Sequence, residues 1–307
     1  MKILTATEKP FAAAAVNGIK EICQAAGHEA VLLEKYTDRQ QLLDAAADAD
    51  ALIVRSDKVT PEVIAAAPKL KIVVRAGAGY DNISLDACTE RGIVVMNTPG
   101  QNSNAVAELA LAMMIYMSRN CFTPGTGKEI SGKKLGIQAY GNVGRLVAAK
   151  AKALGMEVMA YDPFVPAEKM LADGVVPATT LEEMYSSCNF ISLHIPATAE
   201  TRGSIGYSLL SLMPDGACLV NTARKEVINE AELVKVLSDR AGLKYVTDIA
   251  ADCQAELNEK FGKRVFATPK KMGAETAEAN INAGLAAARQ IVEYFATGCT
   301  RFQVNAK

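Results

Sequence analysis

The stretch that decides the fold is "KLGIQAYGNVGRLVAAKAKALGMEVMAYDP", residues 134–163. Its apolar run at 134–137 predicts a strand, and the Ala-rich run at 142–154 predicts a helix. A second predicted strand, 157–161, leads into Asp162. A strand, a glycine-bearing turn, a helix and a strand in this order indicate a βαβ unit of a parallel sheet.

The turn inside this unit has the residues of a dinucleotide site. Its glycines, 141 and 144, allow the backbone to approach a pyrophosphate, whose negative charge lies at the N-terminus of the following helix. Asp162 stands 162 − 141 = 21 positions after Gly141 and can accept hydrogen bonds from ribose hydroxyls. An aspartate there repels a 2′-phosphate, so NAD is favoured over NADP. The predicted cofactor-binding residues of this unit are Tyr140, Gly141, Asn142, Val143 and Asp162.

One position departs from the usual GxGxxG pattern. The first glycine is replaced by Ala139, which costs free energy if the turn needs a positive φ. A βαβ turn that binds nothing is therefore the alternative interpretation of this segment, but the aspartate at the end of the second strand argues against it.

On both sides of this unit, short β-branched runs alternate with Ala-rich helical patterns, which indicates an α/β fold of two doubly wound parallel-sheet lobes. A break is predicted after "NTPGQNS" (97–103), with about six strands following it. The five strands predicted before the break are Lys2–Thr5, Ala30–Leu33, Ala51–Arg55, Lys71–Arg75 and Val94–Asn97.

Composition narrows the class of protein. A chain of 307 residues suggests two domains, and its net charge of −1 favours neither nucleic acid nor an anionic membrane surface as a partner. The N-terminus has no signal-peptide pattern, and the longest apolar run, 109–117, is too short to span a membrane. Seven scattered cysteines with no CxxC pair fit reduced thiols rather than a metal site. We therefore expect a cytoplasmic protein without a bound metal.

Four further motifs establish a family resemblance. They are "RAGAGYDNI" (75–83), "NTPGQNSNAVAELALAMM" (97–114), "LHIP" (193–196) and "NTARKEVINEAELVKVL" (221–237). Together they resemble the D-isomer-specific 2-hydroxyacid dehydrogenases over nearly the whole chain. The resemblance implies a Rossmann NAD-binding domain at 99–277 and a flavodoxin-like substrate-binding domain formed by 1–98 plus 278–307. It also implies a homodimer held by the NAD-binding domains.

The resemblance assigns roles to individual residues. Arg224 matches the arginine that orients the substrate, and a guanidinium can grip a carboxylate with two parallel hydrogen bonds. Arg55 and Ser56 lie where the phosphate of a phosphorylated substrate is held, although a solvated charge at a strand end is the alternative for Arg55. The turn Ala76, Gly77, Ala78, Gly79 is expected to offer backbone N–H groups to the substrate carboxylate. Residues expected to line the cofactor are His194, Thr222, Ala223, Arg224 and Asp248.

The sequence departs from the family at the acid/base group. The Thr-Pro-His motif that carries the catalytic histidine reads Thr268-Pro269-Lys270 here, and the position of the glutamate that orients this histidine is Cys253. Asp252 and Glu256 are only nearby. An ammonium has no tautomer to fix, so a lysine needs no orienting carboxylate. We therefore predict Lys270 as a substrate-binding residue and the acid/base, with a pKa depressed by burial and by neighbouring cations, including Lys225.

The predicted reaction is the NAD-dependent oxidation of 3-phosphoglycerate to 3-phosphohydroxypyruvate, the first step of phosphorylated serine biosynthesis. Three alternatives stay open. The acid/base group is Lys271, or water or Arg224, instead of Lys270; the substrate is that of a glyoxylate/hydroxypyruvate reductase or another D-2-hydroxyacid dehydrogenase; or the chain is a non-catalytic NAD-binding regulatory scaffold. The sequence leaves open the preferred direction of the reaction and any redox role of Cys253.

Overall fold

A computed structural model describes residues 1–305 and divides the chain into two compact units. The first unit is Met1–Asn102 together with Glu275–Lys307, and the second is Ser103–Ala274. The boundaries predicted from sequence, 98/99 and 277/278, lie 102 − 98 = 4 and 277 − 274 = 3 residues away. Within residues 1–305, none of the helices combines the length and the apolar composition that a bilayer crossing requires.

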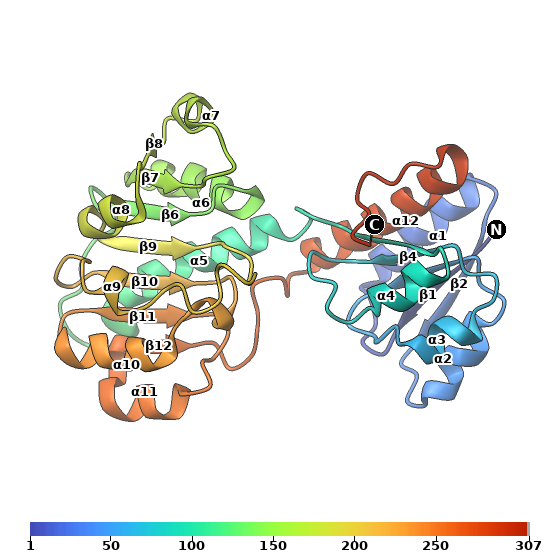
Figure 1. Ribbon diagram of the computed structural model, residues 1–307, viewed down its shortest axis with the longest axis horizontal. Helices are drawn as coiled ribbons and strands as arrows, with labels where there is room; N and C mark the ends of the chain where they lie inside the picture. Colours follow the sequence, from blue (N-terminus) through green and yellow to red (C-terminus); the bar gives the residue numbers. More distant parts are fainter. Residues whose placement is uncertain (306–307) are drawn as a thin grey trace. The chain divides into compact units, whose positions relative to one another are not determined.

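The first unit contains five parallel strands, as predicted: β1 (Lys2–Thr7), β2 (Glu29–Glu34), β3 (Ala51–Val54), β4 (Ile72–Arg75) and β5 (Val94–Asn97). They lie in the order β2-β1-β3-β4-β5, which is the flavodoxin-like order; Figure 1 labels β1, β2 and β4 among them. All four residues of β3 are buried, because both faces of the sheet are covered. Leu52 and Val54 pack into one hydrophobic cluster, and Ala51 and Ile53 into the other.

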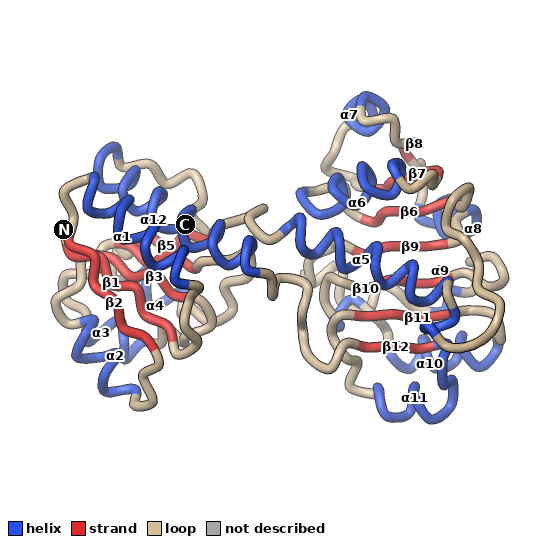
Figure 2. Tube along the Cα trace, turned by 180° about the vertical axis from the view of Figure 1, so that it is seen from behind, coloured by secondary structure: helices blue, strands red, loops and turns tan. Residues whose placement is uncertain are grey.

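Helices from both ends of the chain cover the first sheet. Its helices are α1 (Ala13–Ala25), α2 (Arg39–Ala46), α3 (Pro61–Ala66), α4 (Leu85–Glu90) and α12 (Ala277–Thr297). α1 buries Ala15, Ile19 and Cys23, which are spaced four apart, in the same cluster as the buried face of α12. α2, α3 and α4 contribute to the cluster on the other face (Figure 2). The C-terminal helix therefore completes the core of the N-terminal sheet, which makes this unit discontinuous in sequence.

The second unit contains seven parallel strands: β6 (Lys134–Gln138), β7 (Glu157–Tyr161), β8 (Val176–Pro177), β9 (Phe190–Leu193), β10 (Cys218–Asn221), β11 (Lys244–Thr247) and β12 (Val265–Ala267). Their order is β12-β11-β10-β9-β6-β7-β8. From β8 to β11 this is the Rossmann order, and β12 extends it by one strand. The sequence predicted about six strands because β8, a two-residue edge strand, has no apolar run of its own.

Two hydrophobic clusters lie on the two faces of the second sheet. One contains the buried residues of α5 (Ser103–Ser118), α6 (Asn142–Ala153) and α7 (Ala167–Ala172). The other contains those of α8 (Leu181–Ser187), α9 (Tyr207–Leu210), α10 (Glu230–Asp239) and α11 (Gln254–Phe261). Figure 2 shows α5 and α6 on the same side of this sheet. The predicted α/β class with two doubly wound parallel sheets is confirmed.

The strand order of the second sheet reverses between β6 and β9. The chain leaves β6 toward β7 on one side, whereas β9 pairs with β6 on the other. In open parallel sheets, ligands bind outside the carboxyl ends of the strands at such a reversal. The glycine-bearing turn that follows β6 is therefore at the position that the fold reserves for a ligand.

Candidate active site

The N-terminus of α6 presents free backbone donors. Gly141 is the N-cap residue and no side chain caps the helix. The first backbone bond of the helix runs from Arg145 N to Gly141 O, at 3.1 Å. Among residues 1–305, the N–H groups of Asn142 and Val143 meet no acceptor. A Cβ added to Gly141 would touch nothing within 4 Å. This open helix end fits the pyrophosphate of a dinucleotide.

The second glycine of the turn, Gly144, has a different function. A Cβ at this position would lie 2.2 Å from the carbonyl oxygen of Ala139 and 3.1 Å from Cγ2 of Ile137. Glycine is required here by close packing of α6 on the end of β6, whereas the protein itself leaves the space beside Gly141 open.

Ala139 adopts the backbone conformation for which glycine is normally used, with φ +77°. A left-handed conformation costs a residue with a Cβ about 1 kcal/mol or more. Ala139→Gly is therefore expected to raise the free energy of unfolding by about 1 kcal/mol, measured by urea denaturation. Ala149→Gly is the matched control: the same exchange at an exposed position inside α6 should lower it by a similar amount. Equal effects of the two substitutions would contradict the assignment of strain to Ala139.

The carboxylate of Asp162 fastens the turn from the end of β7. Oδ2 accepts a hydrogen bond from Tyr140 N at 2.7 Å, and Oδ1 accepts one from Phe164 N at 2.9 Å. A carboxylate has about four acceptor sites, so capacity remains for ribose hydroxyls. The N–H of Tyr140 is thus bound to Asp162, and its buried phenol donates to Asp173 at 3.0 Å.

Two more predicted cofactor residues follow β9 and β10. His194 comes directly after β9, and its N–H donates to Gln138 O at the end of β6, at 3.0 Å. Its Nε2 lies 3.0 Å from Ser192 Oγ, and desolvation lowers the pKa of His194 to about 3. The lowered pKa favours the neutral imidazole at physiological pH. Thr222 is 6% exposed, and among residues 1–305 its hydroxyl has no hydrogen-bond partner. A buried hydroxyl of this kind fits a bound polar ligand.

Arg224 lies on a turn that a buried amide holds in place. Asn221, at the end of β10, accepts from Ala223 N at 3.0 Å and donates to Arg224 O at 2.9 Å. The guanidinium of Arg224 donates to Ala223 O at 2.9 Å, and within residues 1–305 it forms no ion pair. The backbone is therefore fixed while the charge stays available for an anion.

Asp248 and Lys270 follow the two neighbouring strands β11 and β12. The carboxylate of Asp248 is 1% exposed and is bonded to the segment that contains Lys270. The side chain of Lys270 is exposed within its own unit. This unit therefore does not supply the burial that the sequence analysis expects around the ammonium. Lys225, expected among the cations beside it, instead forms an ion pair with Asp252.

The carboxylates near the position of the lost glutamate are bound elsewhere. Asp252 pairs with Lys225, and Glu256 pairs with Lys260 at 2.6 Å. Cys253 occupies the glutamate position, and its N–H donates to Glu230 at 2.9 Å. Burial, followed by the contact with Glu230, raises the pKa of the Cys253 thiol to about 12. A thiol with this pKa is not a reactive thiolate at neutral pH, which argues against a redox role.

In the first unit, Arg55 lies just past β3 between neutral partners. Its Nη2 donates to Asn280 Oδ1 at 2.5 Å, and its guanidinium carbon lies 5.3 Å from the centroid of the Phe11 ring. Ser56 beside it is exposed. No carboxylate among residues 1–305 forms an ion pair with Arg55. Its positive charge is therefore oriented but not neutralised.

In the turn after β4, some backbone N–H groups donate to carbonyl oxygens of the protein itself. Ala76 N donates to Val54 O, and Gly77 N donates to Arg75 O, both at 2.8 Å. Within residues 1–305, the N–H groups of Ala78 and Gly79 meet no acceptor. Of the four residues of the turn predicted to offer N–H groups to the substrate carboxylate, Ala78 and Gly79 thus have free ones.

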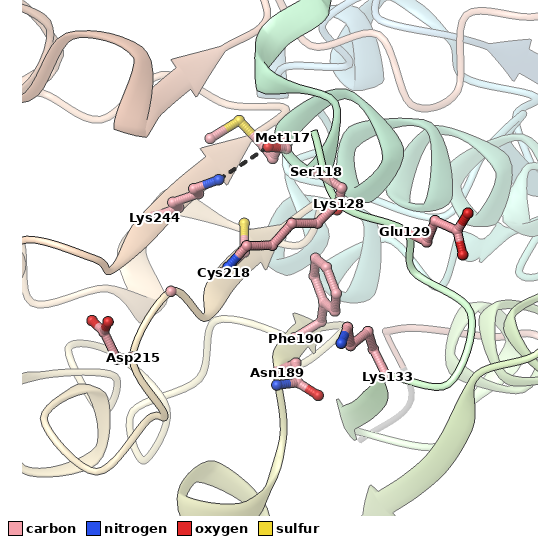
Figure 3. A pocket seen from close by; sticks show the side chains of 11 residues that line it. Met117, Ser118, Lys128, Glu129, Lys133, Asn189, Phe190, Asp215, Cys218 and Lys244 are labelled. Carbon is pink, nitrogen blue, oxygen red and sulfur yellow. Dashed lines mark hydrogen bonds between the residues drawn. The ribbon is translucent and has the colours of Figure 1, made fainter. Parts of the chain in front are cut away.

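Two cavities lie away from these residues. One of about 90 Å³ is bordered by the amino ends of β9, β10 and β11, at the edge of the second sheet opposite the predicted cofactor residues (Figure 3). Lys128, Lys133 and Lys244 border it, and Lys244 Nζ donates to Met117 O at 3.1 Å. A second cavity of about 250 Å³ lies beside α1 and β2 of the first unit. Neither is lined by a predicted site residue. Among residues 1–305 there is also no cluster of three or more His, Cys, Asp or Glu that could hold a metal ion.

Known proteins resemble this arrangement in sequence and structure. Residues 109–270 match the family model described as "D-isomer specific 2-hydroxyacid dehydrogenase, NAD binding domain". A solved structure, the NAD⁺-bound 3-phosphoglycerate dehydrogenase of Entamoeba histolytica, is 49% identical with a TM-score of 0.88, covering 100% of this chain and 99% of that chain. The D-3-phosphoglycerate dehydrogenase of Methanocaldococcus jannaschii is 37% identical over 82% of this chain and 51% of its own length.

A relative that is named for a different activity has a similar sequence identity. The hydroxypyruvate reductase of Thermotoga maritima is 36% identical over 84% of this chain and 88% of its own length. The chain spans about half the length of the archaeal and mycobacterial phosphoglycerate dehydrogenases that it matches. The family match confirms an NAD-binding domain in the second unit. The chain belongs to the D-isomer-specific 2-hydroxyacid dehydrogenase family.

Proposed function

We propose that the protein oxidises 3-phosphoglycerate to 3-phosphohydroxypyruvate with NAD, which is the first step of phosphorylated serine biosynthesis. The observation that carries the proposal is that a guanidinium group in each unit, Arg55 in the first and Arg224 in the second, is held by neutral partners. 3-Phosphoglycerate has two anionic groups, a carboxylate and a phosphate. Two oriented but unpaired cations match these groups better than they match an unphosphorylated hydroxy acid.

In this proposal the residues of the second unit hold the cofactor and one end of the substrate. The free N–H groups of Asn142 and Val143 hold the pyrophosphate, and Asp162 accepts from the ribose. When bound, NAD accepts the hydride that leaves C2 of the hydroxy acid. Arg224 grips the substrate carboxylate with two parallel hydrogen bonds and polarises the C2 oxygen.

Lys270 moves the proton in this proposal. Oxidation releases the proton of the C2 hydroxyl, and the amine form of Lys270 accepts it. In the reverse direction, the ammonium donates a proton to the oxygen that develops negative charge. The support is the place of Lys270 in the chain, two residues after Thr268 at the carboxyl end of β12, on the same sheet edge as Arg224.

Arg55 tests the choice of substrate. Arg55→Ala is expected to lower kcat/KM for 3-phosphoglycerate by roughly 10- to 100-fold, since a hydrogen-bonded charge contributes about 1.5–3 kcal/mol. The same substitution should leave glycerate and glycolate almost unchanged, because neither has a phosphate. The measurement is initial-rate NAD reduction with the three substrates. Arg39→Ala, which removes an exposed arginine paired with Glu62 in the same unit, is the control. An equal loss of kcat/KM for all three substrates would mean that Arg55 does not bind the phosphate.

The likeness to a hydroxypyruvate reductase favours a second candidate function, the reduction of hydroxypyruvate or glyoxylate. That protein is matched over most of its own length, whereas the longer phosphoglycerate dehydrogenases are matched over half. Wild-type kcat/KM higher for hydroxypyruvate than for 3-phosphohydroxypyruvate would select this candidate. Binding of NAD without turnover of any of these substrates would select a non-catalytic regulatory scaffold instead.

A further inference from the structure

The carboxylate of Asp248 is hydrogen-bonded to one segment of the chain. Oδ1 accepts from Met272 N at 2.8 Å, and Oδ2 accepts from Gly273 N at 2.7 Å. The hydroxyl of Thr268 lies 2.9 Å from Oδ1 and 2.8 Å from Asp248 O, so its single proton serves one of the two. Asp248 is 1% exposed and Thr268 6%. Hydrogen bonds from two backbone N–H groups to a buried carboxylate are charge-assisted and strong.

These donors bracket the lysine segment. Thr268 lies two residues before Lys270, and Met272 lies two residues after it. Gly273 is buried, and a Cβ there would lie 2.9 Å from Oδ2 of Asp248 and 3.3 Å from Cγ2 of Val106. Glycine therefore permits the close approach of the carboxylate. The chain is fastened on both sides of Lys270, while the exposed side chain of Lys270 itself takes no part in the anchor.

We propose that Asp248 is a positioning residue that sets the place of Lys270 by binding the backbone of residues 268–273. The inference rests on the proposed role of Lys270. A lysine has a long flexible side chain, and no carboxylate among residues 1–305 forms an ion pair with Lys270. Its place is therefore determined by the backbone that carries it. This role differs from the direct contact with the nicotinamide that the family resemblance assigns to Asp248.

The first test is Asp248→Asn in the full-length protein. An amide offers one oxygen and an NH₂ group, so one of the two backbone N–H groups would face a donor instead of an acceptor. We expect kcat to fall about 100-fold, as for a small misplacement of a reacting group. The Kd for NAD, measured by calorimetry, and the KM for 3-phosphoglycerate should stay unchanged. Hydrogen exchange of the peptide that spans 268–274 should become faster. Glu256→Gln, at an exposed ion pair on α11, is the control for loss of a carboxylate.

The second test leaves Asp248 in place. Gly273→Ala introduces a Cβ against the carboxylate and should loosen the same segment, with a similar loss of kcat and an unchanged Kd for NAD. If Asp248→Asn weakens NAD binding while the exchange of 268–274 stays slow, Asp248 is a cofactor contact and the proposal is wrong. Wild-type kcat in Gly273→Ala would also overturn it. If Lys270→Met retains turnover while Asp248→Asn still accelerates hydrogen exchange of 268–274, the acid/base role of Lys270 is wrong. Asp248 then holds the segment but does not position a catalytic group.

Discussion

Replacing Lys270 by methionine is expected to lower kcat by about 10²- to 10⁴-fold, the usual contribution of a positioned acid/base group. Methionine keeps much of the length and apolar volume of the lysine stem but can neither accept nor donate the proton of the C2 hydroxyl. Because the side chain of Lys270 is exposed and supports no core packing, the fold and NAD binding should persist. The measurement combines steady-state rates in both directions with calorimetric binding of NAD.

Lys271→Met supplies the comparison within the same segment. If Lys270 is the acid/base, Lys271→Met keeps most of the wild-type kcat. A reversal of this pattern would transfer the role to Lys271, and near-normal turnover in both variants would assign proton transfer to water. An acid/base role is compatible with the exposure of Lys270, since the hydrogen bond between an acid/base group and its substrate often forms only in the complex with substrate.

Replacing Arg224 by lysine should lower kcat/KM by about 10²- to 10³-fold, the effect of removing one donor that stabilises developing charge. Lysine keeps the positive charge but presents a point donor, so the two parallel hydrogen bonds to a carboxylate are lost. The buried Asn221 holds the backbone of this turn and is untouched by the change. The free energy of unfolding should therefore be close to that of the wild type, measured by urea denaturation.

Chemical rescue separates this role from a structural one. In Arg224→Ala, added guanidinium ion should restore part of the lost activity, whereas equal concentrations of ammonium should not. Full activity in Arg224→Lys would show that charge alone is sufficient and that a planar fork is not used. A loss of NAD binding equal to the loss of kcat/KM would place Arg224 on the cofactor instead of the substrate.

Much of the fold follows from periodicity in the sequence. β3 and β4 are short apolar runs bounded by polar turns, and α1 shows apolar residues four apart, so both kinds of element are readable from spacing. β8 was missed because two residues of an edge strand bury little and carry no pattern. The reversal of strand order between β6 and β9 also follows from the order of elements along the chain, since a βαβ unit with a glycine turn begins the Rossmann arrangement.

The site was less predictable because hydrogen-bond partners depend on the folded backbone. The residue types around Tyr140 suggested a ligand-binding turn, but the N–H and the hydroxyl of Tyr140 itself are both bound by carboxylates. The N–H of Gly77 likewise turns inward to Arg75. The sequence did raise the question of strain at Ala139, and the positive φ confirms it. No spacing rule could indicate that Asp248 binds residues 24 and 25 positions further along the chain.

Because Asp248 binds the backbone on both sides of Lys270, the position of Lys270 does not depend on how many residues lie between Asp248 and Thr268. Residues 249–267 form a loop, α11, a short 3-10 helix (Gly262–Arg264) and β12. The two residues that flank this interval, Asp248 and Thr268, are hydrogen-bonded to each other. Closing a longer interval costs little, about 0.6 kcal/mol for each doubling of its length. At the end of α11, a Cβ on Gly262 would meet nothing within 4 Å. Inserted residues at this surface turn are therefore expected to change the turn and leave the segment bound by Asp248 where it is.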